Sequence, residues 1–216
     1  MFFEIYDRVA RVAEKYSGPG KKFTPSEFTN LIRRQFAGAD FVFKTMKDDA
    51  VDPDMIVVAG SYDPMEDSIG EPSIEICLCY CPGQRYYFID LIDWEKLCFD
   101  LAECICHEGI HQLQYRKQRS QRDFIMKLDD IDVHHDPDYL SNDLEIEAYG
   151  FSIAAESVMY GVHFTECSMY QIYEKTFDKY PMVMAKLEQQ ILKYLKFLEI
   201  TYEKSSPRVA TRIRYR

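Results

Sequence analysis

The sequence predicts an α+β fold from three observations: a group of strand-like segments, a long helical pattern after it, and a second helical stripe near the end. Runs of β-branched and aromatic residues between turn residues predict strands at 40–46, 55–61, 73–80 and 85–90. Helical spacing of apolar residues predicts one helix over 92–118. With 216 residues, 47% of them hydrophobic, the chain can bury a substantial core.

Helices are also expected before the strands. An amphipathic pattern predicts a helix over 2–16 that ends at a turn of Gly and Pro residues. The next helix is expected to begin at Thr24, which can cap it, with Pro25 in the first turn and Glu27 placed to complete a capping box.

After the strands, Asn142 or Asp143 can cap a helix that runs to about residue 160. The last helix is expected over 181–203. Its apolar side chains recur at helical spacing, which is more typical of a core or a partner-helix surface than of a cofactor site. They are Met184, Leu187, Ile191, Leu195 and Leu198.

The pattern that carries chemistry is HExxH, which spans His107, Glu108 and His111. Residues four apart stack on one helix face, so both imidazoles can bind one Zn²⁺. Glu108 lies one step round, where a carboxylate can take a proton from water acidified by the metal. The alternative is a chance match on a solvated surface helix. Uncharged neighbours such as Ile105, Cys106 and Leu113 favour the metal site.

A catalytic Zn²⁺ requires a third protein ligand, and there is no further His shortly after His111. The best candidates are Glu145 and Glu147, which project about 200° apart on a helix, so only one can face the metal. Glu145 is favoured because Ala148 and Tyr149 share its face and allow a close approach. If neither carboxylate serves, the remaining candidates are His134, His135 and His163.

The run HEGIHQLQYRK together with DYLSNDLEIEAYGFSIA resembles the gluzincin metallopeptidases, and within them small HExxH proteins of tailed bacteriophages. The resemblance covers roughly 54–160. It implies that His107, His111 and Glu145 are metal ligands and that Glu108 is the catalytic base. Many gluzincins have Asp or Asn four residues after the ligand Glu to orient a metal-bound His, and this chain departs from that pattern with Tyr149, so a phenol would have to provide that hydrogen bond.

The resemblance further implies a small, mainly antiparallel sheet packed on the HExxH helix, with a helical C-terminal part. An edge strand of that sheet would bind an extended peptide through backbone hydrogen bonds, and 73–80 is predicted to be this edge. The parts expected along the chain are N-terminal helices at 1–38, a zinc-metallopeptidase-like core at 39–160, a helical extension at 161–204 and a basic tail at 205–216.

The predicted function is hydrolysis of peptide bonds by a zinc-dependent metallopeptidase, encoded by a phage on the resemblance. Glu108 would deprotonate the attacking water and then protonate the leaving amine. An oxyanion donor is expected among Tyr115, Tyr149, Tyr160 and His163, between which the sequence does not choose. The alternative is a non-catalytic virion or assembly protein that keeps the zinc site as a structural element. The intact Glu108 favours the enzyme, because a structural site needs no base.

The net charge and the lack of targeting patterns limit which partners and locations are expected. A net charge of −10 disfavours nucleic acid, except through the arginines of the tail, which lie at 208, 212, 214 and 216. No segment has the pattern of a signal peptide or a membrane span, so the expected location is the cytoplasm, or a virion if the protein is phage-encoded. The expected partners are a peptide or protein substrate and other assembly proteins.

Two further groups of potential metal ligands are not predicted to be metal sites. Cys77, Cys79 and Cys81 alternate along one predicted strand, which is more typical of packed reduced thiols than of a metal cluster. The segment 119–140 is rich in Asp and contains His134 and His135. It lacks the spacing of a calcium-binding loop and is predicted to be a solvated loop rather than a second metal site.

Overall fold

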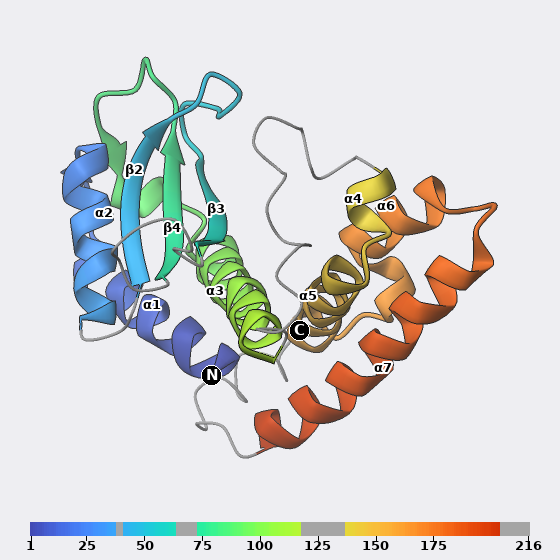
Figure 1. Cartoon of the computed structure of the whole chain (residues 1–216). Helices are drawn as coiled ribbons and strands as arrows, with labels where there is room; N and C mark the ends of the chain where they lie inside the picture. The colour runs from blue at the N-terminus through green and yellow to red at the C-terminus, as the bar shows by residue number, and fades with distance from the viewer. Residues whose placement is uncertain (38–40, 64–72, 118–136, 204–216) are drawn as a thin grey trace. The chain divides into compact units, whose positions relative to one another are not determined.

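The computed structural model describes residues 1–37, 41–63, 73–117 and 137–203 (Figure 1). They group into two compact units, Met1–Gln112 and Leu113–Arg216, so the last turn of the HExxH helix belongs to the second unit. The α+β class is confirmed, with small sheets packed against helices and a helical C-terminal part. The predicted division into four parts stays a prediction.

The first unit contains, in chain order, α1 (Phe2–Tyr16), β1 (Lys22–Phe23), α2 (Pro25–Arg33), η1 (Arg34–Phe36), β2 (Phe41–Lys47), β3 (Ile56–Asp63), β4 (Ser73–Tyr80), β5 (Tyr87–Phe88), η2 (Ile89–Leu91) and most of α3 (Trp94–Lys117). The second unit contains the end of α3, then α4 (Pro137–Leu140), α5 (Asp143–Tyr160), η5 (Phe164–Glu166), α6 (Ser168–Thr176) and α7 (Pro181–Glu203). The predicted helices at 2–16, 143–160 and 181–203 are confirmed.

The larger sheet has three strands in the order β2-β4-β3 (Figure 1). β4 pairs with β2 in parallel and with β3 in antiparallel orientation, so this sheet is mixed. The prediction that 73–80 is an edge strand is therefore wrong, because β4 is hydrogen-bonded on both sides. Its composition explains the central place: Ile74, Ile76, Leu78 and Tyr80 are all buried, whereas most side chains of β2 are exposed.

A second, two-stranded sheet joins β1 to β5. The predicted strand at 85–90 is shorter in the structure, because the chain turns into η2 after Phe88. The backbone N–H of Ile89 still donates to the carbonyl of Lys21, 2.9 Å away, and extends this contact by one residue.

Helix α2 begins with the predicted capping box. The backbone N–H of Thr24 donates to Glu27 Oε2 at 2.9 Å, and the backbone N–H of Glu27 donates to Thr24 Oγ1 at 3.4 Å. The helix packs on the sheet through its buried face, where the hydroxyls of Thr29 and Tyr80 lie 2.9 Å apart. These contacts fix α2 against β4, the strand at the centre of the sheet.

Helix α3 is buried over most of its surface. Leu97, Leu101 and Ile105 are almost completely inaccessible, and Trp94 Nε1 donates to the carbonyl of Ile89 at 3.0 Å. An aromatic contact between Phe2 and Phe99, with ring centroids 6.0 Å apart, joins it to α1. The HExxH motif therefore lies in a buried helix, as its uncharged neighbours predicted.

In the second unit, α5 begins at Asn142, whose side chain accepts the backbone N–H of Leu144 at 2.9 Å. It ends at Gly161, which adopts the left-handed conformation (φ 64°) that favours glycine. Figure 1 shows α7 running alongside α5. The two helices approach closely at Gly150, where an added Cβ would lie 2.5 Å from Gln190 Cβ.

The remaining sequence expectations have mixed outcomes. All seven cysteines are free thiols, as predicted. The Asp- and His-rich segment lies outside the described residues up to 136, and the tail at 205–216 lies outside them as well. Residues 137–140, predicted as loop, form α4 instead. In the part of the chain that the structure describes, no helix is both long and apolar enough to span a membrane.

Candidate metal centre

Helix α3 presents the two histidines of the motif together. Four residues apart, they lie on one face, with ring centroids separated by 4.9 Å and planes inclined at 73°. His107 is buried, with 7% of its surface exposed, and His111 is half-buried. Both rings are thus ordered side by side without any long-range contact having to set their spacing.

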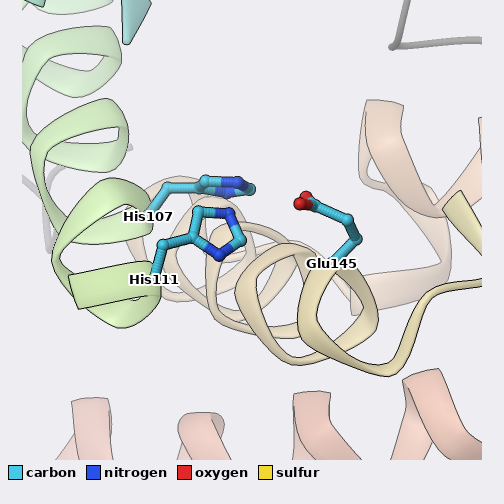
Figure 2. Close-up of side chains that lie close together, drawn as sticks. All are labelled: His107, His111 and Glu145. Atoms are coloured by element: carbon cyan, nitrogen blue, oxygen red, sulfur yellow. The ribbon is translucent and has the colours of Figure 1, made fainter. Parts of the chain in front are cut away.

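Glu145 lies in the first turn of α5 and is buried, with 7% exposed. His107, His111 and Glu145 each offer one ligand atom, and these atoms lie within 4.8 Å of one another. Figure 2 shows the two imidazoles and the carboxylate pointing toward one another. The first ligand choice of the sequence analysis, Glu145, is therefore brought together with the histidines, although binding itself is not shown.

The donor set fits a zinc ion by its chemistry. Zinc bonds to His nitrogen and carboxylate oxygen at about 2.0–2.2 Å, which puts the donors of a tetrahedral site roughly 3–3.5 Å apart. Ligand atoms spread over 4.8 Å need only small side-chain rotations to reach that spacing. Two neutral imidazoles and one carboxylate also leave a fourth position open, as a catalytic site requires.

Glu147 has a different task from Glu145. Its Oε1 lies 2.7 Å from Lys193 Nζ and accepts the Tyr194 hydroxyl at 3.2 Å, while its Oε2 accepts Gln114 Nε2 at 3.0 Å. Burial opposes ionisation, but the hydrogen bonds from Lys193 and Gln114 outweigh it and hold the pKa of Glu147 below its ordinary value. This carboxylate links α5 to α7 and to the end of α3.

Gln114, which the sequence analysis missed, connects the motif helix to the turn that carries Glu145. It is buried, and its Nε2 also donates to the carbonyl of Leu144 at 3.0 Å. This amide therefore ties the last turns of α3 to the start of α5. No feature of the sequence around it, where Gln112, Arg116 and Lys117 are also polar, marks Gln114 out.

Glu108, the expected base, is buried with 8% of its surface exposed. It lies against Gly60 of β3, where an added Cβ would be 2.9 Å from Glu108 Cγ, 3.2 Å from its Oε1 and 2.5 Å from Cys104 Sγ. Burial, with Glu103 and Glu108 nearby, raises the pKa of Cys104 well above its ordinary value, so this neighbour stays a neutral thiol. An isolated Gly within a strand signals such a close approach, and the sequence analysis did not use it.

Tyr149, which follows Glu145 by one turn, is buried, and its ring packs edge-on against Tyr173 with centroids 5.8 Å apart. Burial, with Tyr149 and Glu145 nearby, raises the pKa of Tyr173, whose hydroxyl donates to the carbonyl of Leu140 at 3.0 Å. Tyr173 therefore stays a protonated phenol and joins α5, through Tyr149, to the backbone of α4.

The four residues proposed as oxyanion donors lie at different distances from the candidate ligands. Tyr160 ends α5, about 22 Å along the helix axis from Glu145, and His163 lies beyond it. His163 Nδ1 lies 2.8 Å from Thr165 Oγ1 within the cap of η5. Tyr115 and Tyr149 are the two candidates that adjoin the motif residues along their own helices.

Comparison with family models, with curated proteins and with solved structures finds no match for this chain. The buried triad of His107, His111 and Glu145, with both histidines on α3, is consistent with an HExxH-type site. The case for function therefore depends on the geometry and chemistry of these residues.

Proposed function

We propose that this protein is a zinc-dependent metallopeptidase in which His107, His111 and Glu145 hold the metal and Glu108 is the general base. The observation that carries the proposal is the convergence of three ligand atoms within 4.8 Å, two of them on the helix that also carries the buried Glu108. The likeness of the motif segments to gluzincins and to bacteriophage HExxH proteins supports it.

Zinc is the proposed ion because two imidazoles and one carboxylate form a donor set of intermediate softness. Bound there, it would polarise the scissile carbonyl and lower the pKa of a water molecule. Glu108 would accept the proton of that water and deliver it to the leaving nitrogen.

The proposed substrate is an extended peptide that pairs with β3. β3 stands at one edge of the three-stranded sheet, and the backbone of Gly60 is exposed there while it lies against Glu108. Pairing through backbone hydrogen bonds would bring a peptide bond to the base whatever its side chains. This assigns to β3 the role that the sequence analysis gave to the segment 73–80.

The test combines metal analysis with one substitution. Protein purified without chelator and supplied with Zn²⁺ should hold one equivalent, and it should cleave members of a mixed peptide library. Glu108→Gln should keep the metal and lose turnover by about 10²–10⁴-fold, because the amide cannot accept the proton. Well under one equivalent of zinc in the wild type, or equal turnover in Glu108→Gln, would refute the proposal.

A second candidate function is a structural zinc clamp in a non-catalytic virion or assembly protein. The observation that favours it is the burial of the ligand set, with only 7% of His107 and of Glu145 exposed. Here the metal would stabilise the fold without admitting substrate. Stoichiometric zinc with no cleavage of any library peptide, and a large loss of thermal stability on chelation, would favour this clamp.

A further inference from the structure

Glu103 stands one helical turn before His107 on α3. Its Oε1 lies 3.9 Å from His107 Nδ1, and about a quarter of its side chain is exposed, against 9% for the histidine. Both residues belong to the same continuous helix, so their relative position follows from helix geometry. The carboxylate is therefore held beside one particular nitrogen of the ring.

That nitrogen decides how the ring can serve a metal. A neutral imidazole carries one proton, and a carboxylate near Nδ1 favours the form with the proton on Nδ1 and the lone pair on Nε2. Histidines that bind metals almost always donate their other N–H to a carboxylate, a carbonyl or water, which fixes the ring and strengthens the ligand. The observed 3.9 Å is longer than a hydrogen bond. With about a quarter of its side chain exposed, Glu103 can close the remaining 1 Å or so by rotating that side chain.

The other carboxylate on this stretch of α3 is differently engaged. Asp100 lies one turn before Glu103, and its Oδ2 is 2.6 Å from Lys96 Nζ. It offers a matched control: an acid on the same helix, near the site, whose partner is a lysine rather than an imidazole.

We infer that Glu103 is a positioning residue for the metal centre, accepting the Nδ1–H of His107 so that Nε2 is presented to the ion. This inference rests on the proposed function, because it concerns the same metal. Glu103 does not touch the metal or the substrate, and it acts only through His107.

The experiment is a competitive zinc titration of the wild type, Glu103→Ala, Glu103→Gln and Asp100→Asn. Loss of an outer partner typically lowers metal affinity 10–100-fold, and we expect a loss of that order in Glu103→Ala. Glu103→Gln should lose less, because an amide oxygen still accepts the N–H. Asp100→Asn should remain within about threefold of the wild type, since its carboxylate does not serve His107.

Two further measurements separate positioning from stability. Nitrogen-15 spectra of the imidazoles should show His107 protonated at Nδ1 in the metal-free wild type and a mixture of the two neutral forms in Glu103→Ala. Thermal unfolding of the metal-free proteins should differ little between Glu103→Gln and the wild type. If Glu103→Ala does not fold, the test is made with Glu103→Gln alone: a measurable loss of zinc affinity supports the inference, and an unchanged affinity overturns it.

The outcomes distinguish this inference from the function beneath it. A wild type that binds no zinc refutes both. A wild type that binds zinc, with unchanged affinity in both Glu103 variants, overturns only the role of Glu103. An equal loss in Asp100→Asn also overturns it, because the effect would then come from the helix surface charge.

Discussion

Helices α3 and α5 both carry residues of the candidate centre, and they are positioned in different ways. In α3 the spacing of His107 and His111 comes from the helix itself, and the motif turn has room: among the described residues, a Cβ at Gly109 would meet Met1 Cε, at 3.6 Å. In α5 the first turn is held by tertiary contacts with Gln114 and Lys193, and Gly150 is pressed against α7.

The contrast shows which half of a metal site is local. The two histidines need only helical spacing to lie on the same face, so they are placed together as soon as α3 forms. The carboxylate lies on a second helix, whose first turn is held by hydrogen bonds in which Glu147 is the central acceptor.

The largest effect should come from removing a ligand. His111→Ala should lose stoichiometric zinc, and Glu145→Ala should weaken zinc by more than about 100-fold, beyond what supporting residues typically cost. Glu147→Ala should keep one equivalent, because its carboxylate is engaged by Lys193 and Gln114. A competitive titration checks all three. If Glu147→Ala lost zinc while Glu145→Ala kept it, the roles assigned to the two carboxylates would be exchanged.

The next effect concerns the base. Gly60→Ala should lower peptidase turnover by about 10²-fold while zinc affinity stays near that of the wild type, because the new methyl group would displace Glu108 and not the ligands. Steady-state kinetics and zinc titration on the same preparation measure this. Ala59→Gly on the neighbouring position, whose side chain points to the opposite face, is the control for strand flexibility. Full turnover in Gly60→Ala would show that contact with β3 does not position Glu108 for catalysis.

Two helical glycines should respond with opposite signs. Gly150→Ala should lower the free energy of unfolding by about 1–3 kcal/mol, since the added Cβ would lie 2.5 Å from Gln190 Cβ and 3.3 Å from backbone atoms of α7. Gly109→Ala should raise it by about 0.5–1 kcal/mol, because alanine favours the helix and only ordinary contact is made. Denaturant unfolding of the metal-free proteins checks both. If both substitutions changed the free energy of unfolding in the same direction, the two helices would not differ in how tightly their glycines are packed.

The smallest expected effect is on pH dependence. The pKa of Glu147 is lowered in the folded protein from an ordinary value of 4.5, so its ionised form contributes stability at neutral pH. That contribution is present above pH 4.5 and is lost as the pH falls through the lowered pKa. The advantage of the wild type over Glu147→Gln should therefore be full at pH 7 and shrink in acid, as measured by unfolding at a series of pH values. A constant difference across this range would contradict it.

Local rules accounted for much of the fold. The capping box at Thr24 and Glu27, the cap at Asn142 and the apolar stripe of α7 are each set by neighbours within a few residues, and each is present in the structure. The grouping of His107 with His111 is local in the same sense. Glu145 was favoured by its helix face, and the structure places it in the group.

Pairing between distant segments was not predictable in the same way. The order of residues within 73–80 does not say whether the strand has one partner or two, and its central place appears only when β2 and β3 both pair with it. Gly60 and Gln114 were missed because their importance lies in what another segment brings to them. The close approach of Gly60 to Glu108 and the hydrogen bond from Gln114 to Leu144 exist only in the folded chain.

The strand order also bears on how the molecule folds. β2 and β3 follow one another in the chain but are not neighbours in the sheet, and β4, which is made last of the three, lies between them. A chain that ends before residue 73 therefore lacks the strand with which both of them pair. β3 pairs with β4 across a short connection, whereas β2 pairs with residues 33 positions further along (Phe41 with Ile74), and such non-local pairing is slower. Gly60 reaches Glu108 only after the sheet has formed. Pulsed hydrogen exchange should find the amides of β3 protected no earlier than those of β4.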